Sequence, residues 1–148
     1  MPQSLSNILV HLVFSTKNRR PFIAPQVEDE LWRYLATICT AHGCQAHRVG
    51  GVDDHVHILC GLARTIPVSK LLEEVKASSS KWMKTKGVGE FGWQNGYGAF
   101  SIGQSQFDGV AAYISGQREH HRCWTFQEEY REFLNKYRVQ YDERYVWD

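Results

Sequence analysis

Residues 7–15 constrain the fold more than any other stretch of the chain. They read Asn-Ile-Leu-Val-His-Leu-Val-Phe-Ser, which is apolar at odd and even positions alike apart from His11. Alternate side chains of a strand point to opposite faces of a sheet, so a strand that is apolar at both must be covered on both faces. We therefore expect this segment to be a central strand.

Strand-like and helix-like patterns alternate along the rest of the chain. After the first strand and a basic loop at 17–21, the expected elements are a helix from Pro25 to a stop at Gly43, strands at 44–50 and 55–61, a helix from about Pro67 to Gly87, a strand at 97–102, a helix at 107–121 and a helix from the capping box Thr125-x-x-Glu128. This order predicts an α+β fold of the ferredoxin-like (RRM-like) class. Its β-α-β-β-α-β core would form an antiparallel sheet with helices on one face, followed by two C-terminal helices, and the other face would be partly open.

Length and composition fit one compact domain. The chain has 148 residues, 43% of them hydrophobic and 22% charged, and it contains no internal repeat or linker. No apolar run approaches the roughly 18 residues of a membrane helix, and no signal-peptide pattern opens the chain, so we expect no membrane association. Cys39, Cys44, Cys60 and Cys123 show no Cys-x-x-Cys spacing, which favours reduced thiols and a cytoplasmic location.

The strongest chemical signal is His55-Val56-His57 in the third expected strand. On a strand, both histidines share one face while Val56 and Ile58 fill the other. Two neutral imidazoles on a stiff strand can hold a divalent metal and leave positions open for substrate. The alternative is a hairpin strand with two surface histidines. If Val56 and Ile58 face the helices, both histidines should emerge on the open face.

A second pairing lies on the helix expected at 107–121. Tyr113 and Gln117 are four residues apart, so they should project from one helix surface. Gln117 could offer a metal a neutral oxygen, and Tyr113 could act as a nucleophile. The alternative reading makes Tyr113 a core aromatic and Gln117 a surface residue.

Two other clusters resemble zinc sites only superficially. His42, Cys44 and His47 straddle the helix stop at Gly43, and a second group at His120, His121 and Cys123 lacks a fourth ligand at zinc-site spacing. We expect both groups to be structural, or DNA-facing in the case of residues 120–122.

The chain resembles the single-tyrosine HUH transposases, the small single-stranded-DNA transposases of bacterial insertion sequences, and their REP-associated relatives. The segments that carry the resemblance are His-Leu-Val-Phe-Ser-Thr-Lys-Asn-Arg-Arg-Pro at 11–21, Asp-His-Val-His-Ile-Leu at 54–59, Trp-Gln at 93–94, Gly-Tyr-Gly-Ala-Phe-Ser at 96–101, Tyr-Ile-Ser-Gly-Gln-Arg-Glu-His-His at 113–121, Thr-Phe-Gln-Glu-Glu-Tyr at 125–130 and Tyr-Asp-Glu-Arg-Tyr at 141–145. The resemblance implies that residues 1–148 form a single HUH transposase domain.

The resemblance also implies a mechanism. His55, His57 and Gln117 would bind one Mg²⁺ or Mn²⁺, and Tyr113 would attack DNA at the ends of the element. The product would be a covalent 5′-phosphotyrosine with a free 3′-OH, which allows rejoining without ATP. The implied partners are single-stranded DNA carrying a hairpin and a second copy of the chain, in a homodimer where the histidines of one subunit meet the tyrosine helix of the other. Because glycine is costly inside a helix, Gly116, together with Asp108-Gly109 before the helix, suggests points of flexibility; the alternative is a tolerated glycine on a crowded face.

The candidates for DNA contact are basic and aromatic side chains. The net charge of +1 gives no bulk attraction for nucleic acid, but the basic residues cluster locally. The candidates are Lys17, Arg19, Arg20, Lys76 and Arg118 for phosphates, and Trp93 and Tyr97 for stacking on exposed bases. The alternatives are solvated surface for the charges and core packing for the aromatics.

Two rival functions remain open at this stage. One is a domesticated REP-associated enzyme that nicks palindromes in its host genome. The other is a non-catalytic nucleic-acid-binding module on the same sheet plan, with the histidines as ordinary surface residues.

Overall fold

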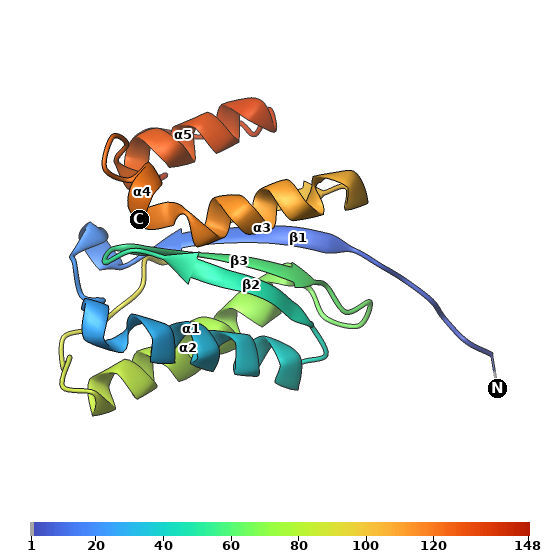
Figure 1. Ribbon diagram of the computed structural model, residues 1–148, viewed down its shortest axis with the longest axis horizontal. Coiled ribbons are helices and arrows are strands. Elements are labelled where there is room, and N and C mark those ends of the chain that lie inside the picture. The colour runs from blue at the N-terminus through green and yellow to red at the C-terminus, as the bar shows by residue number, and fades with distance from the viewer. Residues whose placement is uncertain (1) are drawn as a thin grey trace.

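The computed structural model describes residues 2–148 and confirms the predicted α+β, ferredoxin-like class (Figure 1). The elements are β1 (Leu9–Ser15), the 3₁₀ turn η1 (Lys17–Arg19), α1 (Pro25–Ala41), β2 (Ala46–Gly51), β3 (His55–Gly61), α2 (Val68–Thr85), β4 (Gly98–Ile102), the 3₁₀ turn η2 (Gln104–Gln106), α3 (Phe107–Ser115), α4 (Gln117–His120) and α5 (Phe126–Lys136). Among residues 2–148 no helix is long and apolar enough to span a membrane. All four cysteines are free thiols, as predicted.

The sheet is antiparallel, and its strand order is β2-β3-β1-β4. The prediction that residues 7–15 form a central strand is confirmed, because β1 pairs with β3 on one side and β4 on the other. In the β1–β3 register, Leu12 lies opposite Ile58 and Val13 lies opposite His57. This register sets which side chains share each face.

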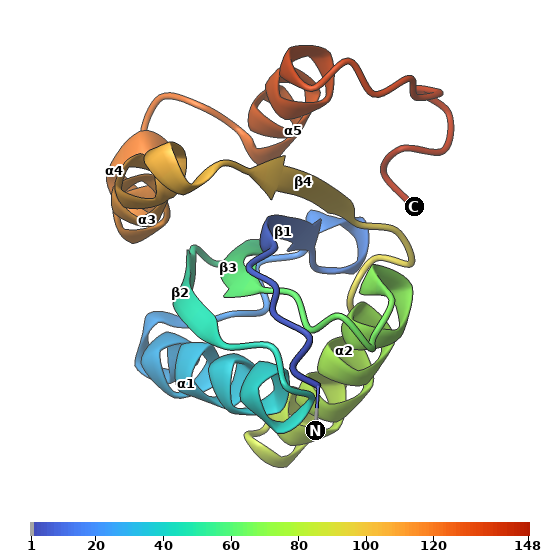
Figure 2. The same cartoon turned by 90° about the vertical axis from the view of Figure 1, so that its right-hand side faces the viewer.

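One face of the sheet carries the larger apolar core, which α1 and α2 cover (Figure 2). Its members from the sheet are Val10, Leu12, Phe14, Val56, Ile58 and Cys60, and they pack against a helical set that includes Leu31, Leu35, Leu71, Leu72, Val75 and Met83. The prediction that Val56 and Ile58 face these two helices is therefore confirmed.

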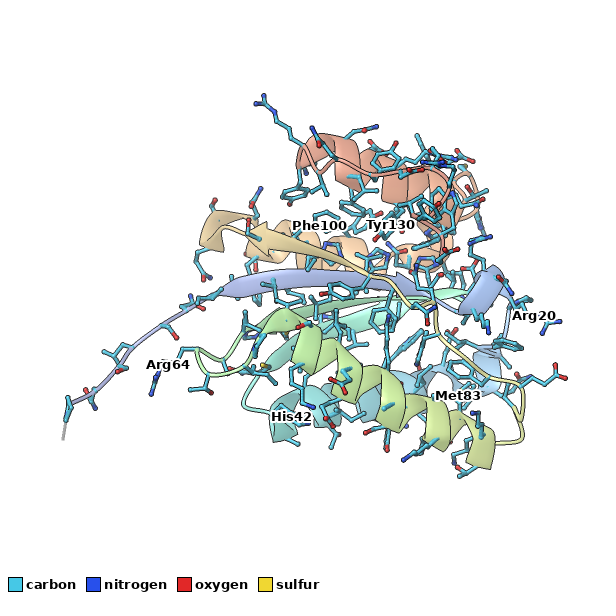
Figure 3. All side chains as sticks on the ribbon, turned by 180° about the vertical axis from the view of Figure 1, so that it is seen from behind. Arg20, His42, Arg64, Met83, Phe100 and Tyr130 are labelled. Carbon is cyan, nitrogen blue, oxygen red and sulfur yellow. The ribbon has the colours of Figure 1, made fainter. Side chains whose placement is uncertain are left out.

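The opposite face is not open, contrary to the expectation from sequence. Helices α3, α4 and α5 lie across it, so His55 and His57 are buried with no exposed surface (Figure 1). The reason is that the C-terminal helices are themselves amphipathic and must bury an apolar side. Helix α5 places Phe126, Tyr130 and Leu134 against the sheet, and Figure 3 shows Tyr130 beside Phe100 of β4.

The helix expected at 107–121 is interrupted. Helix α3 ends at Ser115, Gly116 caps it, and the short α4 begins at Gln117. Glycine loses more backbone conformational entropy in a helix than residues with a side chain do, so Gly116 favours a helix break at this position. Tyr113 and Gln117 nevertheless stay adjacent, since the Gln117 amide nitrogen donates to the Tyr113 carbonyl at 3.4 Å.

A close approach between β2 and α3 fixes the position of the tyrosine helix. Gly50 lies opposite His57 in the β2–β3 register. A Cβ atom at Gly50 would come within 2.6 Å of the Ile114 carbonyl oxygen, a distance that forces something to shift. The absence of a side chain at Gly50 thus lets α3 rest directly over the histidine strand.

Candidate active site

The strand alternation that buries the apolar core also delivers three histidines to the opposite face. His11 comes from β1, and His55 and His57 come from β3. All three side chains are at most 1% exposed. The neighbouring positions of β1 and β3 on the same face hold the apolar residues Leu9, Val13 and Leu59. Buried imidazoles need polar partners, and the structure supplies one for each ring.

His55 is held by an acid that directly precedes it in the chain. Its Nδ1 lies 2.7 Å from Oδ1 of Asp54, and its Nε2 lies 3.0 Å from Oε1 of Gln117. A carboxylate on one ring nitrogen fixes the tautomer with the proton on Nδ1 and directs the Nε2 lone pair inward. In the neutral ring this lone pair faces the acceptor oxygen of Gln117, an arrangement that a cation between the two atoms would satisfy.

His57 bridges β1 and α5. Its Nδ1 lies 2.8 Å from Nε2 of His11, and its Nε2 lies 3.0 Å from Oε1 of Glu129. Burial lowers the pKa of His57, although the hydrogen bond to Glu129 opposes the effect. Burial and the neighbouring His57 lower the pKa of His11 well below its ordinary value. Both rings are therefore neutral near pH 7, as metal-binding imidazoles must be.

Glu129 joins the histidines from the first half of α5. It is 2% exposed, with Oε1 at 3.5 Å from Nε2 of His55 and Oε2 at 3.2 Å from Nε2 of His121. Burial alone would raise the pKa of Glu129, but hydrogen bonds from His121 and His57 lower it well below the usual range. Glu129 is thus a charged carboxylate in the interior of the protein.

His121 is the positive counterpart of that carboxylate. Its Nδ1 donates to the carbonyl oxygen of Trp124 at 2.5 Å, while its Nε2 faces Glu129. Only the imidazolium can donate from both nitrogens. In agreement, the pKa of His121 is raised overall. Burial by itself would lower this pKa, but the hydrogen bond to Glu129 and the charge of Glu129 outweigh the effect of burial.

Tyr113 reaches the same cluster from α3. Its hydroxyl donates a hydrogen bond to Oε2 of Glu129, and its ring stands edge-on to His57 with 5.7 Å between ring centroids. Burial, followed by the charge of Glu129, raises the pKa of Tyr113 above its ordinary value of 10. The phenol is therefore protonated in the resting site.

A cleft of about 460 Å³ opens beside the phenol, between α3 and α5. Its lining residues are His11, Gln106, Gly109, Val110, Tyr113, His120, Glu129, Glu132, Phe133, Lys136 and Tyr137. The volume lies in the range of small-molecule sites, and the walls combine aromatic rings with the ammonium group of Lys136 and the carboxylates of Glu129 and Glu132. The Tyr113 hydroxyl thus has access to a bound molecule from this side.

The cluster fits a divalent metal ion. Ligand atoms of His55, His121 and Glu129 lie within 4.8 Å of one another, and His121 would join the ligands only after its Nε2 releases a proton. Nε2 of His57 and Oε1 of Gln117 are close to the same point. Imidazole nitrogen together with carboxylate and amide oxygen is a donor set that divalent metals accept. His120 adds a buried Nε2 atom with no hydrogen-bond partner among residues 2–148.

Most of the basic candidates for DNA contact lie at the surface. Lys17, Arg19 and Arg20 flank or form η1, and Arg20 lies 3.6 Å from Glu90. Arg118 is exposed and paired with Glu28 at 2.7 Å. Tyr97 is 37% exposed, so its ring remains open to an outside partner.

Two of the candidates lie inside the protein instead. Trp93 is 8% exposed and donates its indole N–H to Ser79 at 2.9 Å, so its ring belongs to the core and presents no platform for bases. Lys76 donates to the carbonyl oxygens of Gln94 at 2.8 Å and Gly96 at 2.6 Å. Burial lowers the pKa of Lys76 to about 8. Its ammonium group holds the loop before β4 and is not directed at an external phosphate.

Sequence reasoning missed Glu129 and His121. A usable signal existed for Glu129, since it falls within the apolar stripe of α5 between Phe126 and Tyr130. A lone acid on a buried helix face needs a buried partner. For His121 the sequence offered only its cluster with His120 and Cys123, because its approach to His55 depends on the turn between α4 and α5.

The comparisons with known proteins agree with this fold. Residues 4–117 match the family described as IS200-like transposases, and the chain belongs to that family. No curated protein matches the chain.

Two solved structures share its fold. A protein from Deinococcus radiodurans R1, provisionally described as a transposase, is 21% identical with a TM-score of 0.62; the match covers 79% of this chain and 98% of that one. A REP-associated tyrosine transposase bound to a REP hairpin is 14% identical with a TM-score of 0.61; the match covers 84% of this chain and 74% of that one.

Proposed function

We propose that this transposase-family protein cleaves and rejoins single-stranded DNA at insertion-sequence ends through a covalent 5′-phosphotyrosine at Tyr113, leaving a free 3′-OH. The observation that carries the proposal is the position of the Tyr113 hydroxyl. It borders an open cleft and contacts a buried cluster of His57 and Glu129 that fits a metal ion.

His55, His57 and Gln117 would hold Mg²⁺ or Mn²⁺, with Asp54 and His11 orienting the two rings. When bound, the ion offsets the negative charge that builds up on the phosphate during its displacement.

Cleavage exchanges one phosphorus–oxygen bond for another. The Tyr113 oxygen attacks phosphorus, the bond from phosphorus to the 3′ oxygen breaks, and the 3′ oxygen takes a proton from solvent. The hydrogen bond to Oε2 of Glu129 positions the hydroxyl, and the phenol proton passes to solvent as the new bond forms. The phosphotyrosine bond conserves the energy of the phosphodiester, so a 3′-OH can reverse the step.

Cations after the carboxyl end of β1 and on α4 would bind the DNA backbone. Lys17 and Arg19 belong to η1, Arg20 follows it, and Arg118 lies on α4. Phosphate contacts of this kind give a binding constant that falls steeply with salt. The hairpin in the REP-associated relative supports a folded single strand as the substrate.

A covalent-adduct experiment tests the proposal. The protein is incubated with single-stranded hairpin oligonucleotides and Mn²⁺, and adducts are resolved on denaturing gels. We expect an adduct for the wild type and for Tyr137→Phe, a matched change on the cleft wall, and none for Tyr113→Phe. Adduct formation that survives in Tyr113→Phe would contradict the assignment of the nucleophile.

The homodimer with shared active sites is a separate part of the proposal. One chain already brings Tyr113 against His57, so sharing would require α3 to exchange partners, and Gly116 offers the point of flexure. Mixing His57→Ala and Tyr113→Phe subunits tests this point. Recovered cleavage supports sharing, whereas no recovery in well-exchanged mixtures shows that each chain completes its own site.

The REP-associated structural relative favours a second candidate role, in which the same chemistry nicks palindromes of the host genome. The two roles differ only in the DNA they recognise. Cleavage of oligonucleotides drawn from the ends of the element, compared with palindromes elsewhere in the genome, distinguishes them.

A further inference from the structure

We infer that Glu129 is a fourth protein ligand of the metal ion, so that the site is anionic instead of the neutral His-His-Gln set. The inference rests on the proposed function, because it assumes a divalent ion at His55, His57 and Gln117. Glu129 lies on α5, beyond the residues 4–117 that match the transposase family. It is therefore a feature of this chain that the family match does not supply.

The position of the carboxylate carries the inference. Oε1 of Glu129 is 3.0 Å from Nε2 of His57 and 3.5 Å from Nε2 of His55, the same two atoms that would bind the metal. The remaining ligand atom, Oε1 of Gln117, is 3.0 Å from Nε2 of His55. The carboxylate oxygen thus converges with the other three ligand atoms, and all four can accept a cation.

The chemistry of the donor set points the same way. Mg²⁺ and Mn²⁺ favour oxygen ligands, and carboxylates bind them better than neutral amides do. A buried carboxylate is costly unless it is paired, because desolvation disfavours its charge. Here Oε2 faces Tyr113, His121 and His120, and Oε1 lies 3.0 Å from Nε2 of His57, the atom that would share the metal ion with it.

The packing of α5 holds this carboxylate in place. Thr125 caps the helix by accepting from the Glu128 backbone at 3.2 Å, and Phe126, Tyr130 and Leu134 anchor it to the sheet. Glu129 projects from this rigid element into the site with 2% of its surface exposed. Glu132, less than one turn later, is exposed on the cleft wall and provides a matched acid outside the site.

Mn²⁺ binding in the absence of DNA tests the inference. The free ion is followed by electron paramagnetic resonance and its affinity by titration calorimetry, for the wild type and for Glu129→Gln, His57→Ala and Glu132→Gln. We expect Glu129→Gln to weaken Mn²⁺ binding at least tenfold, and Glu132→Gln to leave it within twofold of the wild type. Glu129→Asp keeps the charge but shortens its reach, so it should also weaken binding.

The outcomes separate the inference from the proposed function. Wild-type affinity in both Glu129→Gln and Glu129→Asp, together with lost binding in His57→Ala, would overturn the role of Glu129 and leave the metal site intact. Wild-type protein that binds neither Mn²⁺ nor Mg²⁺ would overturn the inference and the proposed metal dependence together. Circular dichroism spectra and melting curves of the metal-free variants check that each one is folded.

Discussion

The two faces of one sheet follow opposite rules in this protein. On β1 and β3, the side chains that face α1 and α2 are all apolar or thiol, and they form the larger core. The side chains on the other face, only one residue away in sequence, include three buried histidines, two of which contact Gln117 or Glu129. The strand period of two keeps the chemistry and the main core apart.

The difference teaches where stability and function reside. Apolar burial on the α1–α2 face stabilises the fold, at about 25 cal/mol for each Å² of apolar surface. Buried charges on the α3–α5 face gain little or cost stability, since desolvation offsets much of their attraction. We therefore expect substitutions on the first face to unfold the protein and conservative substitutions on the second to spare the fold while removing activity.

The largest expected effect is on the apolar face. Phe14→Ala should lower the free energy of unfolding by about 3–5 kcal/mol, because it leaves a cavity beside Trp93 in the core. Tyr113→Phe on the other face should lower it by less, about 1.5–3 kcal/mol, since one hydrogen bond to a buried carboxylate is lost and no cavity forms. Urea titrations measure the free energy of unfolding of both variants. Equal losses in the two variants would contradict the assignment of stability to the α1–α2 face.

The next effect concerns the residue that orients His55. Asp54→Ala removes the carboxylate 2.7 Å from Nδ1 of His55 and should weaken Mn²⁺ binding about 10–100-fold. Asp53→Ala, at the preceding position, is the control and should leave affinity unchanged. Calorimetric titration with Mn²⁺ measures both, and equal affinity for Asp54→Ala and the wild type would show that Asp54 does not orient the ring.

A smaller effect is expected where β2 meets α3. Gly50→Ala places a Cβ atom 2.6 Å from the Ile114 carbonyl oxygen, so α3 must move away from β2. We expect a loss of about 1–3 kcal/mol in the free energy of unfolding and a fall in adduct formation, since Tyr113 moves with α3. Gly89→Ala, where no atom lies within 4 Å of the added carbon, is the control. Unchanged adduct formation in Gly50→Ala would show that the site tolerates the shift.

The smallest effect concerns the cation on the apolar side. Lys76 packs over the Phe14 ring at 5.1 Å, and burial lowers its pKa from 10.5 to about 8. Between these values the unfolded chain binds more protons than the folded one, so the contribution of Lys76 to the free energy of unfolding rises with pH and is flat below pH 8. Nuclear magnetic resonance of the Lys76 ε-carbon measures the titration, and a midpoint above 10 would contradict this environment.

The sequence was sufficient to predict the fold class and the face of the histidines. Period-two alternation around Val56 and helical spacing around Leu31 and Leu71 are local signals, and each corresponds to an element in the structure. Capping residues placed the start of α5 at Phe126.

The burial of the site could not be read from the same signals. It depends on α5 packing across the sheet, which brings Glu129 within 3.0 Å of His57 over a separation of 72 residues. The inward direction of Trp93 and Lys76 likewise depends on contacts with Ser79 and Gln94 from neighbouring elements. Contacts between residues this far apart in the sequence produce no local sequence pattern from which they could be predicted.

The most direct test of the two-faced sheet is the position of a bound metal. Crystals soaked with Mn²⁺ and measured near the manganese absorption edge would locate the ion by its anomalous scattering. We predict one strong peak on the α3–α5 face, in contact with Nε2 of His55, Nε2 of His57 and Oε1 of Gln117. A peak elsewhere, with none between these atoms, would contradict the claim that this face of the sheet is a metal-dependent active site.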